Sequence, residues 1–309
     1  MEHFLEGKVD WDVNSLGITD EELQKKAVPR AFSPSASKAS AACMARFALD
    51  RFVPRPFDPL SPADIGTIAH SIFEELFNEK SVNRTRKRGN ELFKHVTQDA
   101  LKNDELHKYF TENPDDQTLW RSLIIKACSG LFTIFNPSEV EVIGTEEKLY
   151  NVQLGGVDMI GYIDLLLEED ESLVIWDYKT GKYMPEASRF GDCEHDTQQR
   201  LYFAALICQG RNVSGANLAY TSEGKARKVN TDETKVADDV KHFAENYATL
   251  LQCQKQNSYP NKTGVLCGWC PYVKACPAAQ MSVNVKYSRH ALDESGDATG
   301  KAYNVDELF

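Results

Sequence analysis

The sequence predicts an α/β protein in which a central sheet lies between helical segments. Two apolar runs rich in β-branched and aromatic residues, 157–167 and 173–178, are separated by the acidic segment 168–172, which is typical of a β-hairpin. Apolar residues with helical spacing precede this hairpin and follow it. We therefore expect one core with helical additions, closed by a cysteine-containing loop.

The composition is that of an ordinary soluble protein. The chain has 309 residues, of which 42% are hydrophobic and 26% are charged. No apolar run approaches the length that spans a bilayer, so no membrane partner is expected. The first residues lack a basic region followed by an apolar core, which excludes a secretory signal, and we expect a cytoplasmic protein.

The net charge of −11 argues against nucleic-acid binding until its distribution is considered. Residues 1–24 carry −6 and residues 293–309 carry −4, which leaves −1 for the rest of the chain. A basic run between residues 80 and 88 is a candidate phosphate contact, with a solvated helix end as the equal alternative. Its members are Lys80, Arg84, Arg86, Lys87 and Arg88.

The N-terminal third is expected to be an extension followed by helices. Residues 1–32 are acidic, show no sustained period and are predicted to be loosely packed. Ser33 and Pro34 predict a helix start, with Cys43 on that helix. A second helix from Pro62 places His70 beside its apolar face, where a packed histidine is the simplest local interpretation. Helical patterns continue to residue 138.

The segment 139–231 is expected to form the sheet. Because side chains alternate along a strand, Asp177 and Lys179 project on one side, beside Asp164 if the register allows. Glu146 or Glu147 could approach the same place. Taken alone, these residues also fit a buried ion pair.

A helix beginning at Asp196 or Thr197 places Gln198 and Tyr202 one turn apart. The last part, 232–280, is predicted to be a helix followed by the cysteine loop. Residues 281–309 form a polar, acidic tail.

Three of the eight cysteines stand close together, as Cys267, Cys270 and Cys276. Without a secretory signal, metal ligation is favoured over disulfides. Three thiolates are one fewer than zinc or a 4Fe–4S cluster requires, and the fourth ligand is Cys43 or Cys193. The remaining cysteines lie in helical apolar patterns and are expected to pack as small hydrophobes.

These motifs, in this order, resemble the RecB-type branch of the PD-(D/E)XK nuclease superfamily, in particular iron–sulfur-stapled exonucleases related to CRISPR adaptation nucleases and to the AddB nuclease domain. The similarity covers residues 33–277, within an expected single nuclease domain at 33–280 that has a central mixed sheet. Its motifs are Gly66-x3-His70, Ile163-Asp164, Asp177-Tyr178-Lys179, Gln198-x3-Tyr202 and the cysteines.

The resemblance implies a DNA exonuclease of recombination, repair or replication that acts on single strands or duplex ends. It implies Mg²⁺ or Mn²⁺ held by His70, Asp164, Asp177 and the carbonyl of Tyr178, with Lys179 orienting or activating water. Gln198 and Tyr202 would contact DNA or brace the site. It also selects Cys43 as fourth ligand of a 4Fe–4S cluster with Cys267, Cys270 and Cys276. The alternatives are a non-catalytic DNA-binding or assembly module and a zinc-stapled structural protein.

The tail ends in Leu308 and Phe309 after acidic residues. Such a segment resembles terminal peptides that dock on replication or recombination proteins. A solubilising end and a segment that folds back onto the DNA groove are the other interpretations.

Overall fold

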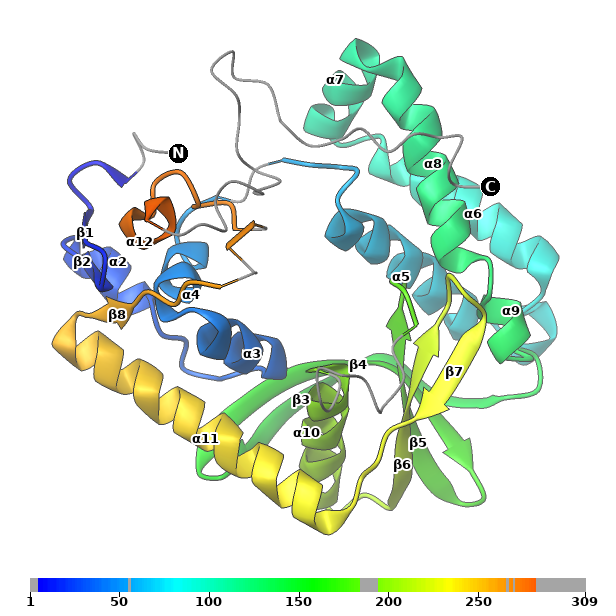
Figure 1. The fold of residues 1–309 in the computed structure, drawn as a ribbon. Helices are drawn as coiled ribbons and strands as arrows, with labels where there is room; N and C mark the ends of the chain where they lie inside the picture. Colours follow the sequence, from blue (N-terminus) through cyan, green and yellow to red (C-terminus); the bar gives the residue numbers. More distant parts are fainter. Residues whose placement is uncertain (1–4, 55–56, 184–193, 265–266, 269, 282–309) are drawn as a thin grey trace. The chain divides into compact units, whose positions relative to one another are not determined.

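The computed structural model describes residues 5–54, 57–183, 194–264, 267–268 and 270–281. The chain forms two compact units (Figure 1). Met1–Pro56 and Glu245–Phe309 form the first, here called the cysteine unit, and Phe57–Ala244 form the second, here called the sheet unit. Cys193 and residues 282–309 of the predicted tail lie outside the described residues, so the docking function of the tail stays a prediction. Within the described ranges, every helix is too short or too polar to cross a membrane.

The sheet unit is built on five strands in the order β3-β4-β5-β6-β7. Only the β5–β6 pair is parallel, and the other pairs are antiparallel, so the predicted α/β class with a mixed sheet is confirmed. The strands are β3 (Glu141–Leu154), β4 (Val157–Glu169), β5 (Ser172–Lys179), β6 (Val213–Tyr220) and β7 (Lys225–Lys228).

Tight turns join the first three strands and set their register. Asp170 and Glu171 both have positive φ, 48° and 61°, as do Gly155 and Gly156 in the preceding turn. Two-residue turns with positive φ match the twist of paired strands. The predicted hairpin is confirmed: Leu165 pairs with Trp176, which makes Asp164 and Asp177 the next positions on the two strands.

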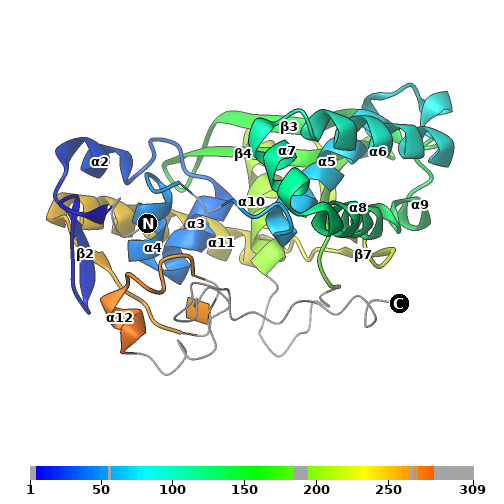
Figure 2. The same ribbon diagram turned by 90° about the horizontal axis from the view of Figure 1, so that it is seen from above.

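Helices before β3 pack against the sheet (Figures 1 and 2). The first, α5 (Pro62–Asn78), begins as predicted, because the Ser61 hydroxyl accepts from the Asp64 amide at 3.2 Å. Their apolar faces form a core with Leu165 and Leu167 of β4. The other members of this layer are η1 (Ser81–Asn83), α6 (Arg86–Ala100), α7 (Asp104–Glu112), α8 (Pro114–Cys128) and α9 (Leu131–Ile134).

The crossover helix α10 (Glu194–Cys208) connects β5 to the parallel strand β6. It buries Leu201, Ala205 and Leu206. The sheet is followed by α11 (Glu233–Gln256), a single helix that begins in the sheet unit and ends in the cysteine unit. The helix expected at the start of 232–280 is therefore present.

The cysteine unit contains a small sheet in the order β1-β2-β8. The expectation that residues 1–32 are loosely packed is wrong, because Leu16 and Ile18 are buried and the Asn257 side chain bonds both backbone groups of Ile18. Strands of three and four residues are too short to show a period. The elements are β1 (Val9–Trp11), β2 (Ser15–Ile18), α2 (Glu21–Lys26) and β8 (Tyr259–Pro260).

Contrary to the prediction, Cys43 does not lie on a helix. Helix α3 (Pro34–Ala42) starts at the predicted Ser33 cap and ends before Cys43, and α4 (Met44–Asp50) starts after it. Cys43 itself is extended, with φ −167° and ψ 114°. The alanine-rich sequence favours helix throughout, so tertiary structure overrides local propensity at this residue. Helix α12 (Pro277–Gln280), the last in the described part of the unit, follows Cys276 directly.

Candidate metal centre

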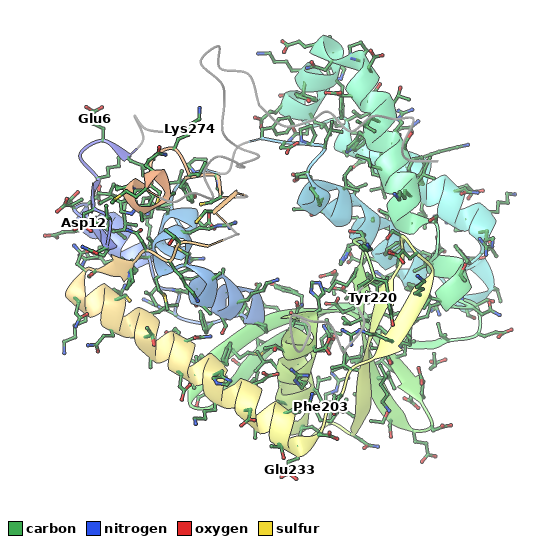
Figure 3. All side chains as sticks on the ribbon, viewed as in Figure 1. Glu6, Asp12, Phe203, Tyr220, Glu233 and Lys274 are labelled. Atoms are coloured by element: carbon green, nitrogen blue, oxygen red, sulfur yellow. The ribbon has the colours of Figure 1, made fainter. Side chains whose placement is uncertain are left out.

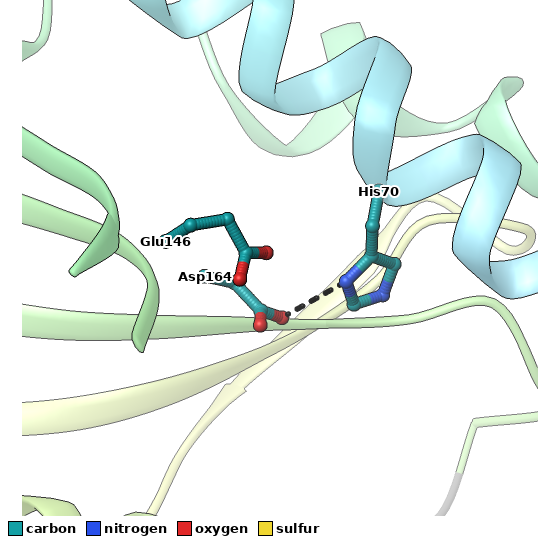
Figure 4. A group of neighbouring side chains, drawn as sticks. All are labelled: His70, Glu146 and Asp164. Carbon is teal, nitrogen blue, oxygen red and sulfur yellow. Dashed lines mark ion pairs between the residues drawn. The ribbon is translucent and has the colours of Figure 1, made fainter. Parts of the chain in front are cut away.

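One helix and two strands of the sheet unit bring three potential ligands together (Figure 4). His70 comes from α5, Glu146 from β3 and Asp164 from β4. One donor atom of each lies within 4.8 Å of the others, an arrangement that could hold a metal ion. His70 Nδ1 is 3.5 Å from Asp164 Oδ2, the contact drawn as a dashed line. The histidine that looked like packing locally therefore faces a carboxylate.

Glu146 reaches this group through an unusual backbone conformation. Its φ is 47°, in the left-handed region, inside a strand. Such a conformation costs an L-residue roughly 1–2 kcal/mol, and strain of this kind clusters at functional sites. Of the two glutamates that the sequence left open, Glu146 joins the group and Glu147 pairs with Arg211 at 3.2 Å.

Asp177 and Lys179 occupy the end of β5, beside the three potential ligands. Lys179 Nζ lies 2.5 Å from Asp177 Oδ2. Asp177 is 2% exposed, so this carboxylate depends on partners within the protein. The backbone amide of Tyr178, between the two, donates to Asp164 Oδ2 at 2.8 Å and ties β5 to β4 at the site. The predicted convergence of two carboxylates and an ammonium is present.

Helix α10 supplies two amides to the same carboxylate. Gln198 Nε2 and Gln199 Nε2 donate to Asp177 Oδ1 at 3.2 and 2.9 Å. Gln198 also donates to the Tyr202 hydroxyl at 3.2 Å. Tyr202 is 6% exposed and packs on Gly161, where an added Cβ would lie 2.5 Å from the ring. These contacts favour bracing over direct DNA contact for both motif residues, whose substrate-binding role stays a prediction.

Two buried ion pairs hold α10 in this position. Arg227 of β7 donates to both carboxylate oxygens of Asp196, at 3.1 and 2.5 Å. Arg200 donates to Asp239 of α11 at 2.5 Å. Asp196 and Arg200 are 0% and 2% exposed, so solvent water does not hydrate either charged group. Gln199 stands between these two residues in the sequence, with its side chain fixed toward β5.

Burial and repulsion between neighbouring carboxylates dominate the electrostatics of His70, Glu146 and Asp164. Burial, followed by the negative charge of Asp177, raises the pKa of the Asp164 carboxyl well above its usual value. Burial and the neighbouring Glu74 raise the pKa of Glu146. Burial lowers the pKa of His70, which favours the neutral imidazole that binds metals. A divalent cation would offset the repulsion between these carboxylates, so the residues fit such an ion.

A cavity of about 650 Å³ opens at this group. His70, Glu74 and Glu146 line one part of it, and Lys179, Lys182 and His195 line another. Tyr220, the last residue of β6 and labelled in Figure 3, also lines the cavity. The sequence signalled neither His195 nor Gln199, which belong to no motif identified above. A cavity with acidic and basic parts suits a metal ion and an anionic substrate together.

The three arginines of the basic run make contacts within the sheet unit. Arg84 donates to the carbonyls of Glu79 and Val140, at 2.9 and 3.0 Å. Arg88 pairs with Glu79, and the guanidinium of Arg86 lies 4.9 Å from the centre of the Phe132 ring. Lys80 and Lys87 are exposed, and a phosphate contact there stays a prediction.

The four candidate cluster ligands line one cavity of the cysteine unit. Cys43, Cys267, Cys270 and Cys276 share it with Arg46 and Tyr272. Burial raises the pKa of the Cys270 thiol to about 11 and raises that of Cys276. Among the described residues, no three of these sulfurs lie mutually within 4.8 Å. The Tyr272 hydroxyl donates to Asp50 of α4 at 2.8 Å and links the loop to the helix after Cys43.

A mixed sheet that presents two aspartates and a lysine beside a histidine defines a nuclease-type metal centre. The PD-(D/E)XK nuclease superfamily matches residues 31–277, and the chain belongs to this superfamily. No curated protein matches the sequence. Membership indicates a metal-dependent nuclease with DNA as substrate, and His70, Glu146 and Asp164 form a metal site consistent with that activity.

Proposed function

We propose that this protein is a DNA exonuclease that uses Mg²⁺ or Mn²⁺ and acts in recombination, repair or replication. The observation that carries the proposal is the group of His70, Glu146 and Asp164 beside the Asp177–Lys179 pair. Carboxylate oxygens with one imidazole suit these hard cations better than a thiolate set. The exonuclease type and the cellular process rest on the resemblance to the RecB-type branch.

The proposed ligands are His70, Glu146, Asp164, Asp177 and the carbonyl of Tyr178. A bound cation would offset the charge of the phosphodiester and lower the pKa of an attacking water. Lys179 provides a positive point charge next to the scissile phosphate and orients the water. Gln198 and Tyr202 contact the DNA backbone or hold Asp177. Since phosphate contacts carry no sequence information, we expect little base specificity.

We further propose a 4Fe–4S cluster on Cys43, Cys267, Cys270 and Cys276. The shared cavity supports this set. Four thiolates suit either zinc or a 4Fe–4S cluster, and the resemblance to the iron–sulfur-stapled branch favours the cluster. A brown protein with absorbance near ~400 nm supports the cluster, and a colourless protein containing zinc overturns it.

The alternative within the same fold is a DNA-binding or assembly module without catalysis. The presence of Asp164, Asp177 and Lys179 favours the enzyme, because a module that only binds DNA has no need for two carboxylates that repel phosphate.

The decisive experiment is digestion of end-labelled single-stranded and duplex DNA with Mg²⁺, with Mn²⁺ and with EDTA. Circular DNA of both kinds serves as the control for free ends. Cation-dependent loss of linear DNA with intact circles supports the exonuclease. Equal cleavage of circles indicates an endonuclease, and binding without cleavage of any substrate supports the non-catalytic module.

A further inference from the structure

Gln199 is a polar side chain in a fully buried position. It is 0% exposed, and its Nε2 donates to Asp177 Oδ1 at 2.9 Å. Its other polar atom, Oε1, is buried and has no hydrogen-bond partner among the described residues. A buried acceptor without a partner costs about 1–3 kcal/mol, which an apolar residue of similar volume would avoid. Packing alone therefore does not explain a glutamine here.

The geometry of Asp177 accounts for the amide. One carboxylate oxygen, Oδ2, faces the ammonium of Lys179, and the other, Oδ1, accepts from Gln198 and Gln199. An ion pair alone lets a carboxylate rotate about its last torsion, because terminal sp³–sp² torsions are broad. Donors on the opposite oxygen restrict that rotation and fix the plane of the carboxylate.

The two glutamines are not equivalent as donors to the Asp177 carboxylate. Gln198 is only part-buried, and its Nε2 is shared between Asp177 and the Tyr202 hydroxyl. Gln199 makes the shorter bond to Asp177 and is fully buried. Its sequence neighbours Asp196 and Arg200 are fixed by buried ion pairs to β7 and α11. The backbone that carries Gln199 is thus held on both sides.

We infer that Gln199 is a positioning residue, which orients the Asp177 carboxylate for metal binding and catalysis. The inference rests on the proposed function, in which Asp177 is a metal ligand. Partners behind metal ligands typically contribute 10- to 100-fold in metal affinity or activity. Since Gln199 is buried behind Asp177, its loss should change kcat and metal affinity, with little effect on KM for DNA.

The test compares Gln199→Met with Gln209→Met. Gln209 follows the same helix and donates to the Tyr150 carbonyl at 3.2 Å on the exposed surface, away from the carboxylates. Melting temperature, Mn²⁺ affinity measured by calorimetry without DNA, kcat and KM are determined for both variants and the wild type. Gln199→Leu is measured in the same way, in case the Met variant folds poorly.

We expect the Gln199 variants to melt within a few degrees of the wild type, because relief of the unpaired Oε1 offsets loss of the bond to Asp177, while Mn²⁺ affinity and kcat each fall about 10-fold. Gln209→Met should match the wild type in all four quantities. Wild-type Mn²⁺ affinity and kcat in Gln199→Met or Gln199→Leu overturn the inference, as does a fall that follows only from lost stability. A wild type that binds Mn²⁺ but cuts no DNA refutes the proposed enzyme, and the affinity measurement still decides on Gln199.

Discussion

The carboxylate site of the sheet unit and the cysteine cavity of the cysteine unit are assembled in different ways. In the sheet unit, strand pairing puts Asp164 beside Asp177, and the Tyr178 amide bonds Asp164 directly. In the cysteine unit, Cys43 lies in an extended link between two short helices, and the other three cysteines follow one loop. The first site is held by hydrogen bonds between neighbouring strands and a helix. In the second, the described hydrogen bonds lie largely within the loop, such as Gly264 N–H to Cys267 Sγ, and the Tyr272–Asp50 bond links the loop to α4.

The two sites therefore differ in how far their geometry depends on a proposed inorganic group. The carboxylate site has ion pairs and amide donors that keep its geometry when no cation is bound. Burial raises the pKa of the Cys270 and Cys276 thiols. These thiols therefore stay neutral unless a metal ligates them as thiolates. We therefore expect the inorganic group to matter for folding in the cysteine unit and for catalysis in the sheet unit.

The largest expected effect is that of Cys43→Ser. Metal binding contributes about 10 kcal/mol or more to folding in small structural sites, so loss of one ligand should lower iron content and reduce the melting temperature by about 10 °C or more. Iron analysis and thermal unfolding measure both quantities. Cys208→Ser, at an exposed residue of α10, is the matched control, and Cys193→Ser tests the alternative ligand. Loss of iron only in Cys193→Ser would show that the wrong ligand was chosen.

The buried ion pair of the sheet unit should give the next largest effect. Arg227→Met leaves the Asp196 carboxylate, 0% exposed, without its cation and should cost about 3–5 kcal/mol in urea unfolding. Asp196→Leu combined with Arg227→Met should recover most of this loss, because no charge is then buried. Lys25→Met, which removes the exposed pair with Glu22, should change stability by less than about 1 kcal/mol. Equal losses in the single and double variants would contradict the role assigned to the pair.

Lys179→Ala should separate catalysis from folding. Removing one hydrogen-bond donor that stabilises the charge of a transition state typically lowers kcat about 10²- to 10³-fold, equivalent to about 2.7–4 kcal/mol, and we expect a loss of at least this size for the Lys179 ammonium. The melting temperature should fall as well, because Asp177 is 2% exposed and loses its cation, so kcat is measured well below that temperature to separate catalysis from folding. Lys108→Ala, at an exposed position of α7, controls for loss of a lysine. A Lys179→Ala protein that cuts DNA at the wild-type rate shows that the catalytic assignment is wrong.

The smallest effect is expected for Asp164→Asn without divalent cations. Because the pKa of Asp164 is raised in the folded state, the folded protein binds more protons than the unfolded chain above pH ~4. The free energy of unfolding from this group therefore falls as pH rises toward the folded pKa. The lowered pKa of His70 acts in the opposite direction below pH ~6.5, where stability from this group rises with pH.

Asp164→Asn should then melt a few degrees above the wild type in EDTA, with a difference that grows as pH rises from 4 to 8. Added Mg²⁺ should raise the melting temperature of the wild type and leave the variant unchanged. Thermal unfolding over this pH range, with and without Mg²⁺, provides the measurement. A constant difference at all pH values would mean that the Asp164 charge does not act on stability.

Local patterns in the sequence predicted much of the framework. The Ser33 cap, the apolar face of α5 and the acidic turn within 168–172 depend on neighbours in the chain, and the structure has all three. The sequence left open whether Asp164 lies beside Asp177, and the two-residue turn at 170–171 fixes the register that makes them the next positions after the Leu165–Trp176 pair. The superfamily followed from several such motifs in one order.

The parts that the sequence did not predict depend on contacts between distant segments. The positive φ of Glu146 has no local signal, since glutamate rarely adopts this conformation. Gln198 and Gln199 are both glutamines, so the sequence does not show which of them contacts Asp177. The orientation of α10 lets both donate to its carboxylate. The pairing of Arg227 with Asp196 likewise depends on the crossover from β5 to β6. The break of the helix at Cys43 goes against the propensity of its own neighbours.

The irregular backbone of β3 also has a consequence for solubility. β3 is an edge strand of the five-stranded sheet, with register shifts between Val142 and Gly144 and between Leu149 and Val152. Long, flat edges can recruit a strand from another molecule, and bulges interrupt the row of backbone donors and acceptors that such addition needs. The same distorted strand that carries Glu146 to the metal centre therefore protects concentrated protein against edge-to-edge aggregation.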